Sequence, residues 1–140
     1  GHNFRFWQKS SQSLVVRERL PEALATVDVD RRADMPAGSL SHGEKRQLEV
    51  GMALTGNPDL LILDEPMAGL GPGGTVELSK LIRKLKGSLT ILLVEHDMDV
   101  VFSLADRITV LDYGENILTG SPEAVRRNER VRDAYLGDSD

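Results

Sequence analysis

The most constraining feature of the sequence is a continuous apolar run, Leu60–Leu63, that ends in two acidic residues, Asp64 and Glu65. A run that is apolar at every position is typical of a parallel strand that is buried on both faces. A second run of this kind at 89–94 predicts a second strand. Helical patterns separate the two runs, and strands that alternate with helices form βαβ units with a parallel sheet. The chain is therefore expected to have an α/β fold.

The rest of the chain continues this alternation. Pro21 should interrupt the first helix or lie close to its first turn, because proline lacks the N–H that a helix interior needs. Residues 30–39 contain a proline and a glycine and should form a loop. Apolar spacing and breaker residues predict helices at about 16–28, 41–55, 74–86, 97–104, 121–127 and 129–135, and further strands at 107–111 and 116–119 that are joined by a turn.

The composition excludes several classes of protein. The chain has 140 residues, of which 40% are hydrophobic and 28% charged, and this fits one globular domain. Its formal net charge of −5 argues against a nucleic-acid partner, because such proteins carry a basic surface. It has no cysteine for a disulfide or a thiolate metal site. With no secretory signal and no apolar run of about 18 residues, the chain should be cytoplasmic, and residues 1–2 should be an expression-tag scar.

Asp64 and Glu65 lie where ligands usually bind in an α/β fold, at the carboxyl end of a parallel strand. One of the two carboxylates can hold the water shell of Mg²⁺, which prefers oxygen ligands. The other can orient the attacking water in a phosphoryl transfer. The same pair also fits a strand that simply runs into a polar turn, so the two residues alone leave the function open.

The segment Leu40–Glu44, with the sequence LSHGE, lies where the second helix should begin. Ser41 and Gly43 would leave backbone N–H groups exposed at the positive end of the helix dipole, which favours an anion. The pair Ser41 and Glu44 also has the spacing of a capping box, which needs only helix stability to explain it.

His96 directly follows the second apolar strand and lies between Glu95 and Asp97. A histidine in this position can donate a hydrogen bond to a phosphate oxygen. A lone histidine at the end of a strand is also a common surface residue.

Taken in order, these features resemble the ATP-binding cassette (ABC) ATPases of transporters. LSHGE at 40–44 resembles the family signature, and LLILDE at 60–65 resembles the Walker B strand with its catalytic glutamate. Residues 68–71 resemble the D-loop, and His96 resembles the switch histidine. The resemblance covers about 17–137. Within the family, EHDM after the second strand and the ending YLG are most similar to the ATP-binding subunits of branched-chain amino acid or urea-type importers.

The resemblance implies a role for each matching residue. Asp64 would bind Mg²⁺ through water, Glu65 would polarise the hydrolytic water, and His96 would contact the γ-phosphate of ATP. In this family two cassettes enclose two nucleotides head to tail. The signature of this chain would therefore contact a nucleotide held by a second cassette subunit, through Ser41, His42, Gly43 and Glu44.

Two residues depart from the family pattern. Glu44 takes the place of the usual glutamine, and a carboxylate near a phosphate is unfavourable unless it points away. The capping box should point it away. Gly71 takes the place of the D-loop aspartate, so a side-chain contact across the dimer is lost at this position.

The phosphate-binding loop of the family, Walker A, is not found in the sequence. The nearest match is Gly38-x-x-x-x-Gly43, but Glu44-Lys45-Arg46 follows it and no apolar strand precedes it. The chain is therefore expected to be a C-terminal fragment that alone neither binds nor hydrolyses ATP normally. In the family fold the Walker A strand lies between the strands at 89–94 and 107–111. Without it, these strands should pair directly, swap elements or dimerise.

The resemblance also predicts domains and partners. The fold would be a partial P-loop NTPase core with a short parallel sheet flanked by helices, plus part of the helical subdomain. Residues 3–56 would belong to that helical subdomain, and residues 57–140 to the ATPase core. The partners would be a second cassette subunit, or a second copy of the chain in a homodimer, and transmembrane permease subunits at the inner membrane. The system would import an amino acid-like solute.

Two other functions remain open from the sequence. The chain could be a non-catalytic remnant that associates with itself or with a complete cassette. It could also come from a cassette ATPase of DNA repair or translation, which its acidic charge and importer-like ending disfavour. The aromatic residues Phe4, Phe6 and Trp7 either lie near the membrane partner or cover the apolar surface that the missing part of the cassette would leave bare.

Overall fold

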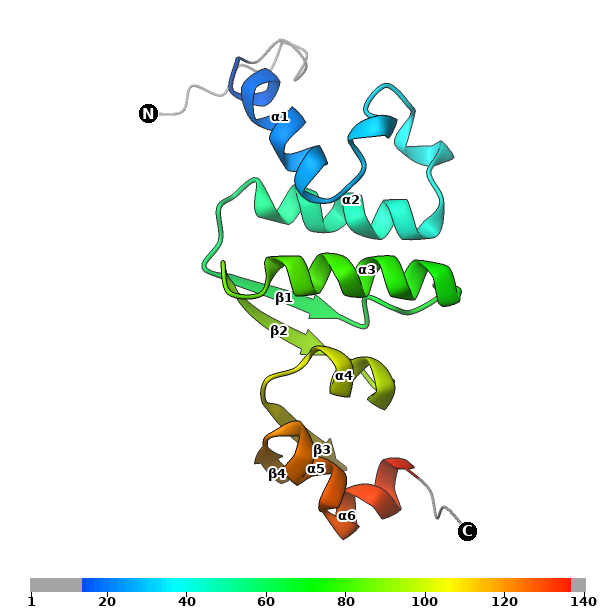
Figure 1. Ribbon diagram of the computed structural model, residues 1–140, viewed down its shortest axis with the longest axis vertical. Coiled ribbons are helices and arrows are strands. Elements are labelled where there is room, and N and C mark those ends of the chain that lie inside the picture. The colour runs from blue at the N-terminus through cyan, green and yellow to red at the C-terminus, as the bar shows by residue number, and fades with distance from the viewer. Residues whose placement is uncertain (1–13, 137–140) are drawn as a thin grey trace.

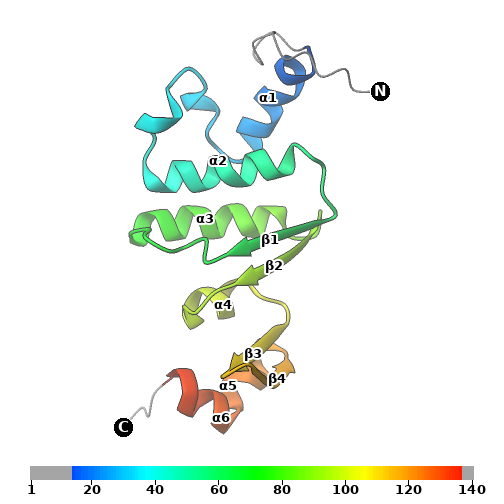
Figure 2. The same cartoon turned by 180° about the vertical axis from the view of Figure 1, so that it is seen from behind.

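The computed structural model describes residues 14–136 (Figures 1 and 2). The aromatic residues Phe4, Phe6 and Trp7 lie outside the described residues, as does Gly137 of the expected C-terminal motif. In chain order the elements are α1 (Leu14–Thr26), α2 (His42–Leu54), β1 (Leu60–Asp64), α3 (Pro72–Leu85), β2 (Thr90–Val94), α4 (Met98–Leu104), β3 (Ile108–Asp112), β4 (Glu115–Gly120), α5 (Pro122–Arg127) and α6 (Glu129–Val131). Short 3₁₀ turns at Asp30–Arg32 and Ala37–Ser39 break up the loop before α2, and a π-helical turn, Arg132–Leu136, follows α6.

The strands form two separate sheets. β1 and β2 are parallel, with Leu61 opposite Ile91, and helices α3 and α4 connect and follow them. β3 and β4 form an antiparallel hairpin whose tip holds Tyr113 and Gly114 at φ of 46° and 81°. Two consecutive residues with positive φ are the signature of a tight hairpin turn that matches the strand twist. The expected short parallel sheet with flanking helices is confirmed, and so is the turn between the last two strands.

The apolar residues gather in two clusters, and α4 contributes to both. The larger cluster joins α2 and α3 to the sheet of β1 and β2, and its most buried residues include Leu78, Leu81 and Ile82 of α3. The smaller cluster lies between the hairpin and the C-terminal helices. Val100 and Leu104 of α4 belong to the first cluster, whereas other side chains of α4 pack against the second. Figure 1 shows the resulting elongated stack, with α1 at one end and α6 at the other.

The prediction that the first strand is buried on both faces is wrong for the described residues. Leu61 is 5% exposed, but its neighbours Leu60 and Ile62 are 49% and 59% exposed, and on β2 the side chains of Leu92 and Val94 are 51% and 47% exposed. The reason is that α3 and α4 pack against one face of the sheet, through the residues that alternate with these four. We call Leu60, Ile62, Leu92 and Val94 the open face.

The strands at 89–94 and 107–111 do not pair directly, so this alternative is also wrong. Within residues 14–136, β2 pairs with β1 and β3 pairs with β4. Helix α4 separates β2 from β3 in the chain and packs into both apolar clusters, which keeps the two sheets on either side of it (Figure 2). The other two expectations, element exchange and dimerisation, remain predictions.

Pro21 neither interrupts the first helix nor lies in its first turn. α1 runs through it without a break, from Leu14 to Thr26. Pro21 is exposed, so water can bond the backbone carbonyl that the missing proline N–H leaves without a helical partner. None of the helices in the described part of the chain has both the length and the apolar character that a membrane span requires.

Candidate functional site

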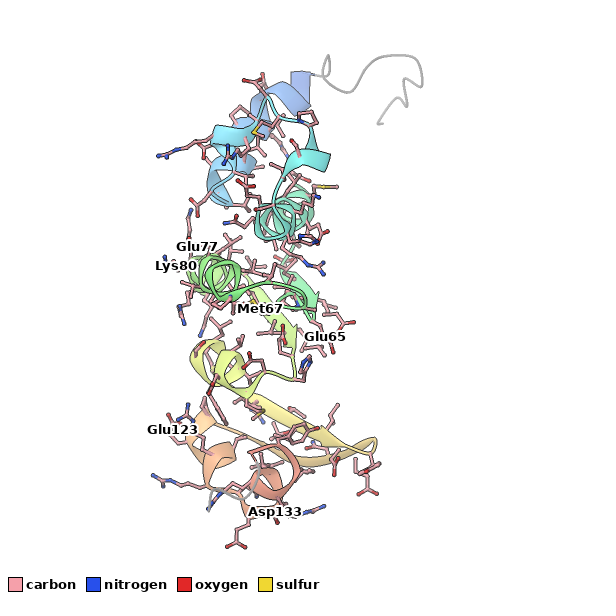
Figure 3. All side chains as sticks on the ribbon, turned by 90° about the vertical axis from the view of Figure 1, so that its right-hand side faces the viewer. Glu65, Met67, Glu77, Lys80, Glu123 and Asp133 are labelled. Atoms are coloured by element: carbon pink, nitrogen blue, oxygen red, sulfur yellow. The ribbon has the colours of Figure 1, made fainter. Side chains whose placement is uncertain are left out.

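Glu65 begins the turn that follows β1, and its backbone is left-handed, with φ of 42°. Such a conformation is uncommon for a residue with a side chain and persists only where neighbouring contacts hold it. Here the Glu65 N–H donates to the carbonyl of Val94, the last residue of β2, at 2.9 Å. The bond continues the parallel ladder by one residue and directs the carboxylate outward. Figure 3 shows Glu65 at the rim of the molecule.

The structure brings Glu65 and His96 together, although 31 positions separate them in the chain. The Oε1 atom of Glu65 lies 3.3 Å from Nδ1 of His96, and both side chains are more than half exposed. The two residues meet because Glu65 directly follows β1 and His96 lies two residues after β2. These strands are parallel and paired, so their ends lie at the same edge of the sheet. The contact is an ion pair when the imidazole is protonated, and it does not involve Nε2.

Glu95 is a residue whose role sequence reasoning missed. Its Oε1 accepts a hydrogen bond from the N–H of Met67 at 3.0 Å, in a partly buried position. The Met67 side chain is 7% exposed and belongs to the larger apolar cluster (Figure 3). Glu95 therefore ties the turn after β1 to the end of β2, next to the contact between Glu65 and His96. The position of an acid directly after an apolar strand was the available signal.

Asp97 fixes the backbone on the other side of His96. It is the N-cap of α4, and its Oδ1 accepts from the N–H groups of Asp99 and Val100 at 3.0 and 3.2 Å. Capping of this kind satisfies two of the donors that the first turn of a helix leaves free. His96 is thus held between a strand end and a capped helix start.

Asp64 ends β1, opposite Val94, and is exposed. It lines a pocket between α2 and β1 together with Arg46 and Glu49. In the described part of the chain, no three acidic, histidine or cysteine side chains gather closely enough to hold a metal ion. A lone exposed carboxylate fits Mg²⁺ only where phosphate oxygens and waters supply the other ligands, which is the usual coordination of this ion beside a nucleotide.

Ser41 and Glu44 form the predicted capping box at the start of α2. The N–H of Glu44 donates to Ser41 Oγ at 3.2 Å, and the N–H of Ser41 donates to Glu44 Oε2 at 2.9 Å. The Glu44 carboxylate is therefore turned back onto the backbone, as the sequence predicts. In the box the hydroxyl oxygen of Ser41 accepts from the backbone, and the Ser41 side chain also helps to lower the pKa of the Glu44 carboxyl.

Arg32 adds a second bond to the same carboxylate. Its Nε donates to Glu44 Oε1 at 2.9 Å from the 3₁₀ turn before the loop. The pKa of the Glu44 carboxyl is held below its ordinary value, first by the hydrogen bond from the Ser41 backbone and then by the bond from Arg32. Sequence spacing offers no signal for this pair, since 12 positions separate the two residues.

Gly43 lies against the start of α3. A Cβ placed on Gly43 would lie 3.6 Å from the Cα of Gly74, so the two helices approach closely at their N-terminal turns. The turn before α3 contains Gly69 at φ of 74° and ends at Gly71, the N-cap of α3. Among the described residues, no hydrogen bond or ion pair joins segment 41–44 to Asp64, Glu65 or His96. The structure therefore contains two separate groups of predicted site residues.

Comparison with protein families finds two matches. Residues 3–68 match the family described as ABC transporter. Residues 115–140 match the family described as branched-chain amino acid ATP-binding cassette transporter. The second match covers β4, α5, α6 and the end of the chain, a region in which the sequence offered only the YLG ending as a sign of the family.

Curated relatives agree with the family matches. The chain is 42% identical over 118 residues to BraF of Pseudomonas aeruginosa, a high-affinity branched-chain amino acid transport ATP-binding protein, and this covers 83% of the chain and 46% of BraF. It is 40% identical over 124 residues to LivG of Escherichia coli, which carries the same description, covering 87% of the chain and 49% of LivG. The chain thus spans about half the length of these relatives.

Solved structures show the same fold. An ATP-binding cassette of an ABC transporter, MJ1267, superimposes with a TM-score of 0.82 at 29% identity, covering 94% of this chain and 55% of that one. CbiO1 of Clostridium perfringens, part of the ABC transporter complex CbiONQ, superimposes with a TM-score of 0.73 at 35% identity, covering 86% of this chain and 49% of the other.

Proposed function

This chain belongs to the ATP-binding cassette family. On that premise we propose that it supplies two parts of an ATPase that drives solute import: the residues at the sheet edge that hydrolyse ATP, and the signature. The observation that carries the proposal is the contact between Glu65 and His96 at the exposed carboxyl edge of the parallel sheet. Neither side chain is buried, and within residues 14–136 the polar group that each contacts is the other, so both can meet a ligand that approaches this edge.

Each residue of the edge has a distinct chemical task. Glu65 orients and polarises the water that attacks the terminal phosphate of ATP. His96 donates a hydrogen bond from its imidazole to a phosphate oxygen, and its contact with Glu65 keeps the ring oriented. Asp64 holds Mg²⁺ through the water shell of the ion, which suits its exposed position at the end of β1. The bound ion supplies positive charge that offsets the charge of the phosphates.

The signature acts on a nucleotide held by a second cassette. Ser41 donates its hydroxyl proton, and His42 and Gly43 offer first-turn N–H groups, which have no helical partner in any α-helix. Glu44 belongs to the same segment but supports it from the capping box. Within residues 14–136 no hydrogen bond or ion pair joins this segment to the Glu65 edge, in keeping with two sites that serve different nucleotides.

The intact system would import an amino acid-like solute. BraF and LivG are described as ATP-binding proteins of branched-chain amino acid transport, and this supports the solute class. The partners would be a second cassette subunit or a second copy of this chain, and transmembrane permease subunits. The chain would then lie on the cytoplasmic face of the inner membrane. Residues 3–56 would form part of the helical subdomain and residues 57–140 part of the ATPase core.

The 140 residues alone should neither bind nor hydrolyse ATP normally. The Walker A backbone and its lysine, which cradle the phosphates in this family of enzymes, are not among these residues. We expect no measurable ATPase activity and an affinity for Mg-ATP weaker than about millimolar, where binding contributes only about 4 kcal/mol. Titration calorimetry of the chain with Mg-ATP checks this, and an affinity in the micromolar range would contradict it.

A complementation assay tests the proposed function directly. The chain is mixed with a complete cassette of the branched-chain type that has lost the serine of its own signature. If Ser41 and Gly43 serve the partner's nucleotide, part of the ATPase activity should return, and Ser41→Ala in the chain should abolish this recovery. Association of the two proteins is measured separately by ultracentrifugation. Association with no recovered activity would instead favour the alternative function, a partner-binding module without catalysis.

A further inference from the structure

Glu44 presents an electrostatic problem for the proposed signature. It lies in the first turn of α2, three residues after Ser41, and its pKa is held below the ordinary value, so it is ionised at neutral pH. A phosphate that approaches Ser41 and Gly43 would meet this negative charge within the same helical turn. The inference below concerns how the chain removes this repulsion, and it rests on the proposed role of the signature.

Arg32 is held in place to meet this charge. The 3₁₀ turn Asp30–Arg32 is anchored on Val29, which is 2% exposed, through the bond from the Arg32 N–H to the Val29 carbonyl at 2.9 Å. The Arg32 side chain then contacts Met35 Sδ at 3.6 Å through Nη1 and Glu44 Oε1 at 2.9 Å through Nε. The turn is bonded to the buried Val29, and it therefore holds the Arg32 guanidinium against the first turn of α2.

The two oxygens of Glu44 have different partners. Oε2 accepts from the Ser41 N–H and closes the capping box, whereas Oε1 accepts from Arg32. Each bond uses one oxygen, so the box does not by itself neutralise the charge. The guanidinium supplies the neutralising charge, and it stays charged at any pH the protein meets. The N–H groups of His42 and Gly43 lie in the first turn of α2, where an α-helix offers them no partner.

We propose that Arg32 is a positioning residue of the signature. It neutralises the Glu44 carboxylate that the capping box holds on the backbone of Ser41, so that the start of α2 can accept a phosphate of the partner's nucleotide. Without Arg32 the capping box would still form, but an unneutralised carboxylate would lie beside the phosphate. The arginine thus acts through Glu44 and need not touch the nucleotide.

The complementation assay tests this role with three variants of the 140-residue chain. Arg32→Ala should lower the recovered ATPase activity about three- to tenfold, the range expected when one solvent-accessible carboxylate loses its counter-charge. Arg31→Ala removes an equal charge from the neighbouring residue of the same turn and should leave the activity unchanged. The double variant Arg32→Ala/Glu44→Gln removes both charges and should restore most of the lost activity, because the glutamine carbonyl can still accept the Ser41 N–H.

The outcomes separate this proposal from the one on which it rests. Full activity of Arg32→Ala, or failure of Glu44→Gln to rescue it, overturns the role of Arg32 and leaves the signature function intact. If the unaltered chain associates with the partner but restores nothing, the signature function fails and the role of Arg32 fails with it. Circular dichroism of each variant tests whether it is folded, and its association constant tests whether it still assembles with the partner. The rescue by Glu44→Gln is a separate control, because loss of a purely structural arginine would not be rescued by this change.

Discussion

At the scale of single residues, the carboxylates divide into those that hold backbone and those that stay exposed. Glu44 accepts the Ser41 N–H, and Glu95 accepts the Met67 N–H. Within the described residues, Asp64 and Glu65 accept no backbone hydrogen bond through their side chains, and Glu65 meets only the imidazole of His96. A carboxylate whose oxygens already bind backbone is less able to serve a ligand. This division agrees with the proposal that Asp64 and Glu65 meet the ligand, whereas Glu44 and Glu95 hold the backbone in place.

The bonds of Glu44 predict a pH dependence of stability. Its pKa in the folded chain lies below the ordinary value of 4.5, so the carboxylate stabilises the fold fully above that pH. The contribution should be lost as the pH falls below 4.5 and through the folded pKa. Glu44→Gln should therefore be less stable than the unaltered chain near neutral pH, and the difference should shrink in acid. Urea denaturation at a series of pH values measures this.

Two variants control the measurement. Arg32→Ala removes one of the causes of the low pKa and should reduce the pH dependence in part. Arg31→Ala changes the same charge without the bond to Glu44 and should leave the profile as it is. A difference between Glu44→Gln and the unaltered chain that stays constant from neutral to acid pH would contradict the prediction.

At the scale of elements, α2 depends on a close approach to the segment that follows α1. A Cβ on Gly51 would lie 2.9 Å from Cγ2 and 3.3 Å from Cγ1 of Val27, a side chain that is fully buried. Valine is stiff about its first torsion and cannot move its methyl groups aside easily. The glycine at this position therefore sets the distance between α2 and the end of α1.

Gly51→Ala should consequently destabilise the chain by about 1 kcal/mol. Alanine gains up to about 1 kcal/mol in helix propensity, but overpacking of a core typically costs about 1–3 kcal/mol. Gly73→Ala in α3 is the matched control, because no heavy atom lies within 4 Å of its Cβ, and its stability should be unchanged or slightly higher. Chemical denaturation of both variants checks this, and a Gly51→Ala chain as stable as the unaltered one would show that α2 can shift.

At the scale of the whole molecule, the two apolar clusters leave one face of the parallel sheet uncovered. Leu60, Ile62, Leu92 and Val94 of this open face are each about half exposed. The free edges of β1 and β2 lie beside them, since these strands pair only with each other in the described part of the chain. Exposed apolar surface next to unpaired strand edges favours association.

The 140-residue chain alone should therefore self-associate through the open face. Light scattering coupled to size exclusion should show a mass above 15.4 kDa that rises with concentration. Ile62→Lys and Leu92→Lys should shift the chain toward the monomer, because each places a charge on the face. Val76→Lys makes the same change at a 51% exposed apolar residue of α3, outside the face, and should have little effect. Unaltered chain that stays monomeric at all concentrations would refute this.

The sequence alone was sufficient to locate most elements and to name the individual groups of the candidate site. Apolar runs predicted β1 and β2, and residues three positions apart predicted the capping box of Ser41 and Glu44. These features depend on neighbours along the chain, so local spacing determines them. The matching motifs also identified the family, because their order is a property of the sequence.

Only the tertiary structure decided which of these groups meet. The contacts of Glu65 with His96, Met67 with Glu95 and Arg32 with Glu44 join residues 12 or more positions apart. The first two depend on the register of β1 against β2, and the third depends on a turn anchored by a buried valine. The tertiary structure likewise decided that one face of the sheet stays open, because an apolar side chain can be recognised in the sequence but the element that covers it cannot.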